Sequence, residues 1–165
     1  MPPNIKLHAV AFISPQNQPI LIRTFTRQDQ QAIKYHYIAH TSLDVIEERV
    51  AAAGKASDCY LGLLFSLEDA AVYGYITPLK VKIVLALPVS DSVIRDAEII
   101  SIFRALHMAF YSSISNPFLK LNSAAETNAE QSAALTVAGP KWKTFKRRVD
   151  DICWIVSQNA STTSS

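Results

Sequence analysis

Glycine is scarce in this sequence, and long hydrophobic runs are absent. The 165 residues include only four glycines and contain no dinucleotide-binding, nucleophile-elbow or C-x-x-C motif. Residues 54–57, GKAS, match only the end of a phosphate loop, because Arg49 stands where the first glycine belongs and the segment follows a predicted helix. No window approaches the roughly 18 apolar residues that a membrane-spanning helix needs. The sequence therefore indicates neither a nucleotide loop nor a transmembrane segment.

Cysteine is also scarce, and the numbers of basic and acidic residues are nearly equal. Cys59 and Cys153 are the only cysteines, and we interpret them as buried free thiols in a reducing compartment. Sixteen basic and fourteen acidic residues leave a net charge of +2, too small and too dispersed to indicate a nucleic-acid partner. The N-terminal segment MPPNIKLHAVAFI lacks a small-residue cleavage pattern, so we expect no secretory signal and a cytosolic protein.

Hydrophobic residues make up 49% of the chain, which is enough for one sizeable core. We therefore expect a single domain over residues 1–156. Between Leu119 and Pro140 the composition changes to Ala, Ser, Thr, Asn and Glu, which predicts a loop insert at 119–140. The Ser- and Thr-rich residues 157–165 predict a flexible tail.

Three apolar runs between Cys59 and Leu87 predict three consecutive strands joined by hairpins. Polar or turn-forming residues separate the runs, as hairpin turns require. Successive side chains of a strand point to opposite faces of the sheet, so strict alternation divides the residues of the first run into two sets, one for each face. One set is Tyr60, Gly62 and Leu64, and the other is Leu61, Leu63 and Phe65. Neither set is polar, so we expect a sheet that is covered on both faces.

Two strands are predicted before this block, and three helices complete the chain. The strands are Ile5–Ile13 and Ile20–Phe25; the helices are Asp29–Ala53, a segment from caps at Asp91 and Ser92 to Asn116, and Trp142–Val156. The order predicts an α+β fold with a five-stranded antiparallel sheet. One helix is expected on one face of the sheet and two on the other.

The first predicted helix carries His36 and His40 one turn apart, with Asp44 a further turn along. Two histidines at this spacing suit a metal, but the helix lacks the glutamate of the zinc-protease motif. We therefore expect no metal or other cofactor, and no catalytic arrangement is indicated. Opposite these residues, the apolar positions from Tyr35 to Ala53 recur every three or four residues. The polar stripe of His36, His40 and Asp44 is thus a candidate partner-binding surface.

Five basic residues lie just before or in the first half of the last predicted helix: Lys141, Lys143, Lys146, Arg147 and Arg148. Such a cluster also occurs in proteins that bind nucleic acid or anionic lipid. The neighbouring aromatic residues fall on the apolar stripe of the helix. We therefore interpret the basic residues as its solvated face.

Three segments of the sequence carry a specific resemblance to a known family. They are Tyr35–Glu48 (YHYIAHTSLDVIEE), Tyr60–Lys82 (YLGLLFSLEDAAVYGYITPLKVK) and Arg95–Phe118, with its RDAEI, FRALH and SNPF pieces. In this order they resemble the sedlin family of the TRAPP vesicle-tethering complex, nearest its subunit 2-like branch. The insert at 119–140 has no counterpart in the resemblance, and the last helix matches only in its amphipathic pattern.

The resemblance implies a longin (profilin-like) fold, whose order ββαβββαα is the one predicted above. It implies a non-catalytic adaptor that supports assembly of a vesicle tether and Rab guanine-nucleotide exchange factor in ER-to-Golgi and Golgi transport. Asp44 matches an acidic residue characteristic of the family and is expected to contact a partner, with His36 and His40 extending that surface.

The partners implied are other TRAPP subunits and, indirectly, a Rab-type GTPase. The implied location is the cytoplasm, with peripheral attachment to ER, cis-Golgi and Golgi membranes through the complex only. The alternative is another longin trafficking module, a SNARE regulatory domain or a small coat-adaptor subunit. A longin SNARE would need a further heptad helix and a membrane anchor.

Overall fold

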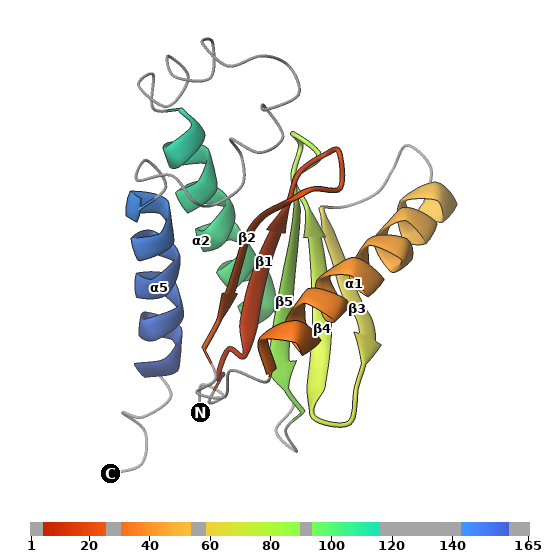
Figure 1. Cartoon of the computed structure of the whole chain (residues 1–165), viewed down its shortest axis with the longest axis horizontal. Helices are drawn as coiled ribbons and strands as arrows, with labels where there is room; N and C mark the ends of the chain where they lie inside the picture. Colours follow the sequence, from red (N-terminus) through yellow and green to blue (C-terminus); the bar gives the residue numbers. More distant parts are fainter. Residues whose placement is uncertain (1–4, 26–30, 54–58, 90–93, 116–142, 159–165) are drawn as a thin grey trace.

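The computed structural model describes residues 5–25, 31–53, 59–89, 94–115 and 143–158. Its strands form one antiparallel sheet in the order β2-β1-β5-β4-β3. The elements are β1 Ala9–Ile13, β2 Pro19–Thr24, α1 Gln31–Ala53, β3 Tyr60–Ser66, β4 Ala70–Ile76, β5 Lys82–Pro88, α2 Asp96–Ile114 and α5 Lys143–Gln158. Helix α1 crosses one face of the sheet, and α2 and α5 lie on the other (Figure 1). The predicted α+β longin-type arrangement is confirmed.

The centre of the sheet joins two separate hairpin units. β1 pairs with β2 in one unit, and β3, β4 and β5 form a meander in the other. The units meet where β1 pairs with β5, from Ala9 opposite Ala86 to Ile13 opposite Lys82. Every residue of β1 is buried, and so is β5 up to Leu87. These central strands are therefore apolar on both sides, as the sequence predicts.

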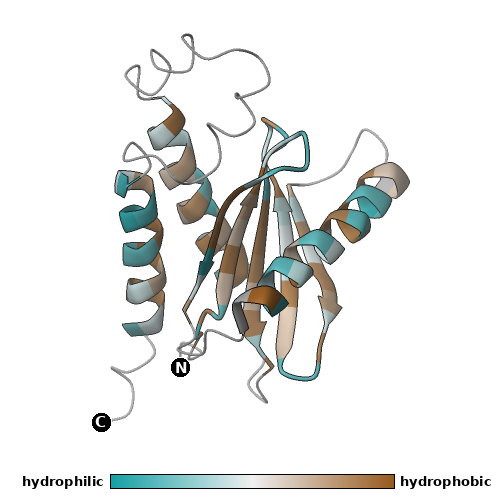
Figure 2. Ribbon diagram, viewed as in Figure 1, coloured by the Kyte–Doolittle hydropathy of each residue, from teal (hydrophilic) through white to brown (hydrophobic). Residues whose placement is uncertain are grey.

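The two faces of the sheet differ in the size of their side chains. Alternate residues of a strand face opposite sides, so Ala9 and Ala11 point toward α1 while Val10 and Phe12 point toward α2 and α5. Small side chains leave room for the larger residues of one helix, such as Tyr35. The opposite face instead packs large residues against two helices. Figure 2 shows hydrophobic colour along the sheet and hydrophilic colour on the outer sides of α1 and α5.

The prediction of strict alternation along β3 is wrong. The pairing of β3 with β4 shifts register twice, between Tyr60 and Gly62 and between Leu63 and Phe65. Gly62 adopts a φ of 76°, a conformation that glycine reaches without steric cost. At each shift β3 has one residue more than β4, so the side chains that follow face the opposite side of the sheet from the one that strict alternation assigns. As a result Leu61 and Leu64 both pack on the α1 side, although the sequence assigned them to opposite faces.

Several predicted boundaries differ from those of the structure. β1 begins at Ala9 and not at Ile5, although Ile5 is buried in the core beneath α2 and α5. The N-cap of α2 is Arg95, which makes no side-chain capping bond. Helix α5 continues to Gln158, two residues past the predicted end of the domain. The predicted caps Asp91 and Ser92, the helix end at Asn116 and the insert at 119–140 lie outside the described residues.

Both cysteines are free thiols. Cys153 is buried, as predicted, and burial raises the pKa of its thiol to about 12. Cys59 is only half-buried, because it lies just before β3, the strand at one edge of the sheet.

The tight β1–β2 turn is tied to the rest of the molecule through Asn17. This residue has a left-handed φ of 62°, its Nδ2 donates to Glu47 Oε1 of α1 at 2.7 Å, and its Oδ1 accepts a hydrogen bond from the buried Lys82 ammonium. Asn17→Ala should lower the free energy of unfolding by about 1–3 kcal/mol, because it leaves a buried charge without that acceptor and strains the turn.

Asn17→Gly is the matched control for this prediction, because glycine tolerates the left-handed backbone but also lacks the amide. Urea unfolding at neutral pH measures both variants. The alanine variant should be less stable than the glycine variant, and the double variant Asn17→Ala with Lys82→Met should recover part of the loss. An alanine variant as stable as the parent would contradict this account.

Candidate partner-binding surface

Helix α1 separates a buried face from an exposed one. The residues predicted to form the core face are buried at Tyr35, Ala39, Leu43 and Ile46 and half-buried at Val50. The predicted polar stripe is exposed at all three of its positions, His36, His40 and Asp44. The structure therefore places the three candidate residues on the exposed side of one helix. Their role in binding a partner stays a prediction.

Two apolar side chains that the sequence analysis missed extend this surface. Ile33 is 78% exposed and Tyr37 is 66% exposed. Together with His40, Asp44 and Glu48 they form a series with steps of four, three, four and four residues, so all five share one side of the helix. The sequence could have identified them, because both residues are apolar and neither belongs to the periodic series of core residues on α1. We call the exposed side of α1, from Ile33 to Glu48, the α1 surface.

Contacts at both ends hold the α1 surface in place on the sheet. Near the start of the helix, the Lys34 ammonium lies 2.5 and 2.6 Å from the two carboxylate oxygens of Asp69, in the β3–β4 turn. Near its end, the Arg49 guanidinium donates to the backbone oxygens of Leu61 and Leu63 on edge strand β3. These contacts fix the position of α1 before any partner arrives, which lowers the ordering cost of binding.

The surface combines the chemistry that protein interfaces use. Tyr37 and Ile33 offer apolar area at one end, and Asp44 and Glu48 offer negative charge at the other. Among the described residues, no three His, Cys, Asp or Glu side chains are grouped so that they could hold a metal ion. The arrangement suits contact with a partner that has an apolar patch beside basic residues.

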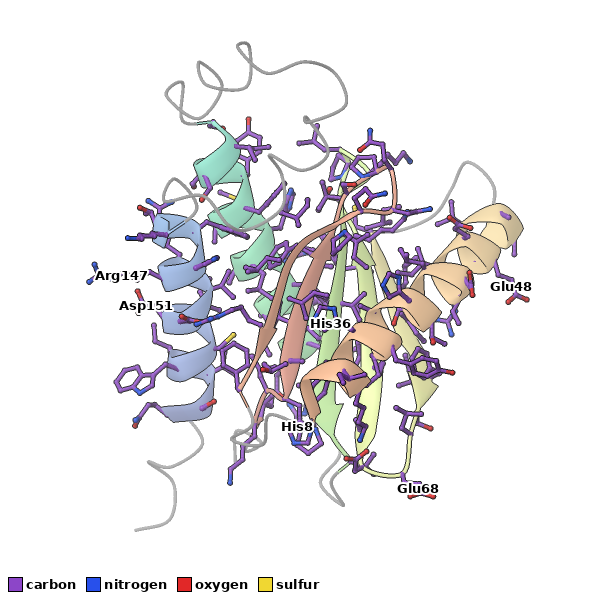
Figure 3. The ribbon with its side chains drawn as sticks, in the orientation of Figure 1. His8, His36, Glu48, Glu68, Arg147 and Asp151 are labelled. Carbon is purple, nitrogen blue, oxygen red and sulfur yellow. The ribbon has the colours of Figure 1, made fainter. Side chains whose placement is uncertain are left out.

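A half-buried histidine lies beneath the N-terminal end of α1. His8, labelled in Figure 3, packs edge-on against Tyr35 with ring centroids 6.4 Å apart. Its Nδ1 is buried and has no hydrogen-bond partner within the described part of the chain. Burial lowers the pKa of His8 below its usual 6.5, Asp69 opposes the shift, and Lys34 adds to it.

This lowered pKa predicts a loss of stability in mild acid. Because the folded state binds its proton at a lower pH than the unfolded state, stability should fall as the pH drops below 6.5 and level off below the folded pKa. His8→Gln removes that titration. Urea unfolding between pH 7.5 and 5 should show the parent losing stability relative to the variant. If the difference in unfolding free energy between the parent and His8→Gln does not change with pH, the predicted role of His8 is wrong.

The element order ββαβββαα, with one helix on one face of a five-stranded antiparallel sheet and two helices on the other, is the arrangement of the longin fold. The family model described as Sedlin matches residues 12–138 of the chain. This match covers most of the chain, so the protein belongs to the sedlin family, as the sequence resemblance predicts. Helix α5 lies beyond the matched residues.

Named relatives agree with this assignment. The chain is 44% identical to the trafficking protein particle complex subunit 2-like protein of Bos taurus over 113 residues, 66% of this chain and 80% of the relative. It is 41% identical to the protein of the same name from Dictyostelium discoideum over 126 residues, 74% of this chain and 89% of the relative. The Xenopus tropicalis protein is 45% identical over 113 residues, again 66% and 80%. The chain thus groups with the subunit 2-like members of its family.

One further structural fact concerns membranes. Within the part of the chain that the structure describes, none of the helices combines the length and the apolar character needed to cross a bilayer.

Proposed function

We propose that this protein is a non-enzymatic adaptor subunit of the TRAPP complex and supports assembly of a vesicle tether and Rab guanine-nucleotide exchange factor. Its partners are other TRAPP subunits, and it meets a Rab-type GTPase and the ER, cis-Golgi and Golgi membranes only through the complex. Family membership and the names of the relatives support the complex. The exposed α1 surface, with His36, His40 and Asp44, is the proposed contact.

The single observation that carries the proposal is the fixed exposed face of α1. Ile33 and Tyr37 are large apolar side chains that remain in solvent, although Lys34 and Arg49 on the same helix are held against the sheet. Exposed apolar side chains beside charge are typical of protein-binding surfaces. A partner that covers them gains apolar burial without first ordering the helix.

Co-purification tests this function. The affinity-tagged full chain is expressed at its natural level in cells of its source, and the recovered proteins are quantified by mass spectrometry. We expect stoichiometric recovery of other TRAPP subunits and Rab exchange activity in the recovered assembly. Recovery as a monomer without other TRAPP subunits, or together with SNAREs or coat adaptors in their place, would overturn the proposal.

A further inference from the structure

A second surface feature lies on the opposite side of the sheet from α1. Helix α5 runs beside the edge strand β2 (Figure 1), and a groove of about 280 Å³ opens between them. The groove is lined by Arg23, Phe25, Asp150, Cys153, Trp154 and Ser157. Its volume suits one large side chain and is small for a drug-sized ligand.

An ion pair fixes the shape of this groove. Arg23 Nε donates to Asp150 Oδ1 at 3.0 Å, and Arg23 Nη2 donates to Asp150 Oδ2 at 2.5 Å. The two-point contact joins β2 to α5 and raises the pKa of Arg23. Cys153 in the wall is buried and keeps its proton, so it adds apolar surface. The groove is therefore present before any ligand binds.

The rim of the groove carries an exposed tryptophan. Trp154 is 64% exposed, and its neighbour Ile155 is 52% exposed. The core contacts of α5 come from Phe145, Val149 and Cys153 instead. Tryptophan is the residue type most enriched among interface positions that dominate binding energy. A largely exposed tryptophan beside a preformed groove indicates a docking site.

The outer side of α5 is positively charged. Lys143, Arg147 and Arg148 are exposed cations, as the sequence predicts, and Lys146 is half-buried. Asp151 is the exposed carboxylate of the described helix and lies one turn from Arg147 (Figure 3), while Asp150 is engaged by Arg23. Three exposed cations against one exposed carboxylate favour an acidic partner.

We propose that the groove between β2 and α5 is a second protein-docking surface, which takes a partner segment with one large apolar side chain flanked by acidic residues. The apolar side chain enters the groove beside Trp154, and the acidic residues face Arg147 and Arg148. Because α1 lies on the other face of the sheet, both surfaces can be occupied at once. A groove of this size favours a protein segment over a bilayer, which needs a broad basic surface with several inserted side chains.

Site-specific photo-crosslinking in cells tests this docking surface. The full chain carries benzoylphenylalanine in place of Trp154, and a matched chain carries it in place of Leu79, which is 51% exposed in the β4–β5 turn. We expect a discrete protein adduct at position 154 that the position 79 chain does not form. The crosslinked peptide should contain a large apolar residue beside Asp or Glu.

Charge-reversal variants on α5 and removal of the Trp154 side chain complete the test. Arg147→Glu with Arg148→Glu should lower the adduct yield at least tenfold. Arg95→Glu with Arg104→Glu, the same charge change at the exposed N-cap of α2 and at an exposed position within it, should leave the yield within about twofold. A synthetic peptide of the crosslinked segment should bind Trp154→Ala at least about tenfold more weakly than the parent. Lipid adducts, no adduct above the position 79 chain, or a yield insensitive to Arg147 and Arg148 would overturn the proposal.

Discussion

Asp44→Lys should lower the recovery of partner subunits with this chain at least tenfold while leaving the fold intact. Asp44 is exposed, and an exposed substitution usually changes stability by less than about 0.5 kcal/mol. A lysine there places a positive charge where the proposed partner carries one, and like charges across an interface cost several kcal/mol. Urea unfolding measures the stability, and quantitative co-purification measures the association.

Glu68→Lys is the matched control for this prediction. Glu68 is an exposed acidic residue in the β3–β4 turn, and Figure 3 shows it apart from Glu48, which lies on α1. This variant has the same charge change but should keep its partners. Tyr37→Ala should weaken association in the same direction as Asp44→Lys, because it removes apolar contact area from the α1 surface. If Asp44→Lys binds normally, or if it unfolds, the assigned role of the surface is wrong.

Phe145→Ala should lower the free energy of unfolding by about 3–5 kcal/mol. Phe145 is 1% exposed, and its ring packs edge-on against Phe12 at 5.0 Å and against Phe110 at 5.6 Å between centroids. It joins α5 to both β1 and α2, so its loss leaves a cavity where three elements meet. A loss of this size is a large fraction of the stability of an ordinary domain, about 5–15 kcal/mol.

Trp154→Ala is the matched control on the same helix. It also removes a large aromatic side chain, but one that is 64% exposed, so its effect on stability should be small beside that of Phe145→Ala. Equilibrium unfolding in urea compares the two variants directly. Equal losses would contradict the division of α5 into a core side and a binding side. Phe145→Leu should recover part of the loss, since leucine refills some of the cavity.

The order of the elements could be predicted from the sequence because it depends on local patterns. The core series of α1, Tyr35, Ala39, Leu43 and Ile46, recurs with the period of a helix, and the structure buries each of these four residues. The same period put His36, His40 and Asp44 on the outside, where they are found. The covered sheet was predicted because neither set of side chains in the run from Tyr60 to Phe65 is polar, and in the structure the central strands β1 and β5 are buried on both sides.

The details that failed depend on contacts between distant parts of the chain. Two register shifts against β4 decide which side Leu61 faces. Gly62 is a local signal of a bulge, but the positions and number of the shifts are set by the pairing with β4. Ile33 and Tyr37 were missed as parts of the α1 surface because their exposure depends on where α1 crosses the sheet.

The sequence by itself determined the fold class, the family and the polar side of α1, because periodicity, turn residues and the resemblance are properties of short segments. Only the tertiary structure decided how firmly α1 is held, through Lys34 with Asp69 and Arg49 with β3. It alone formed the second groove, since Arg23 and Asp150 are 127 positions apart in the chain. Contacts at that separation depend on how the whole sheet and its helices pack, which no local pattern encodes.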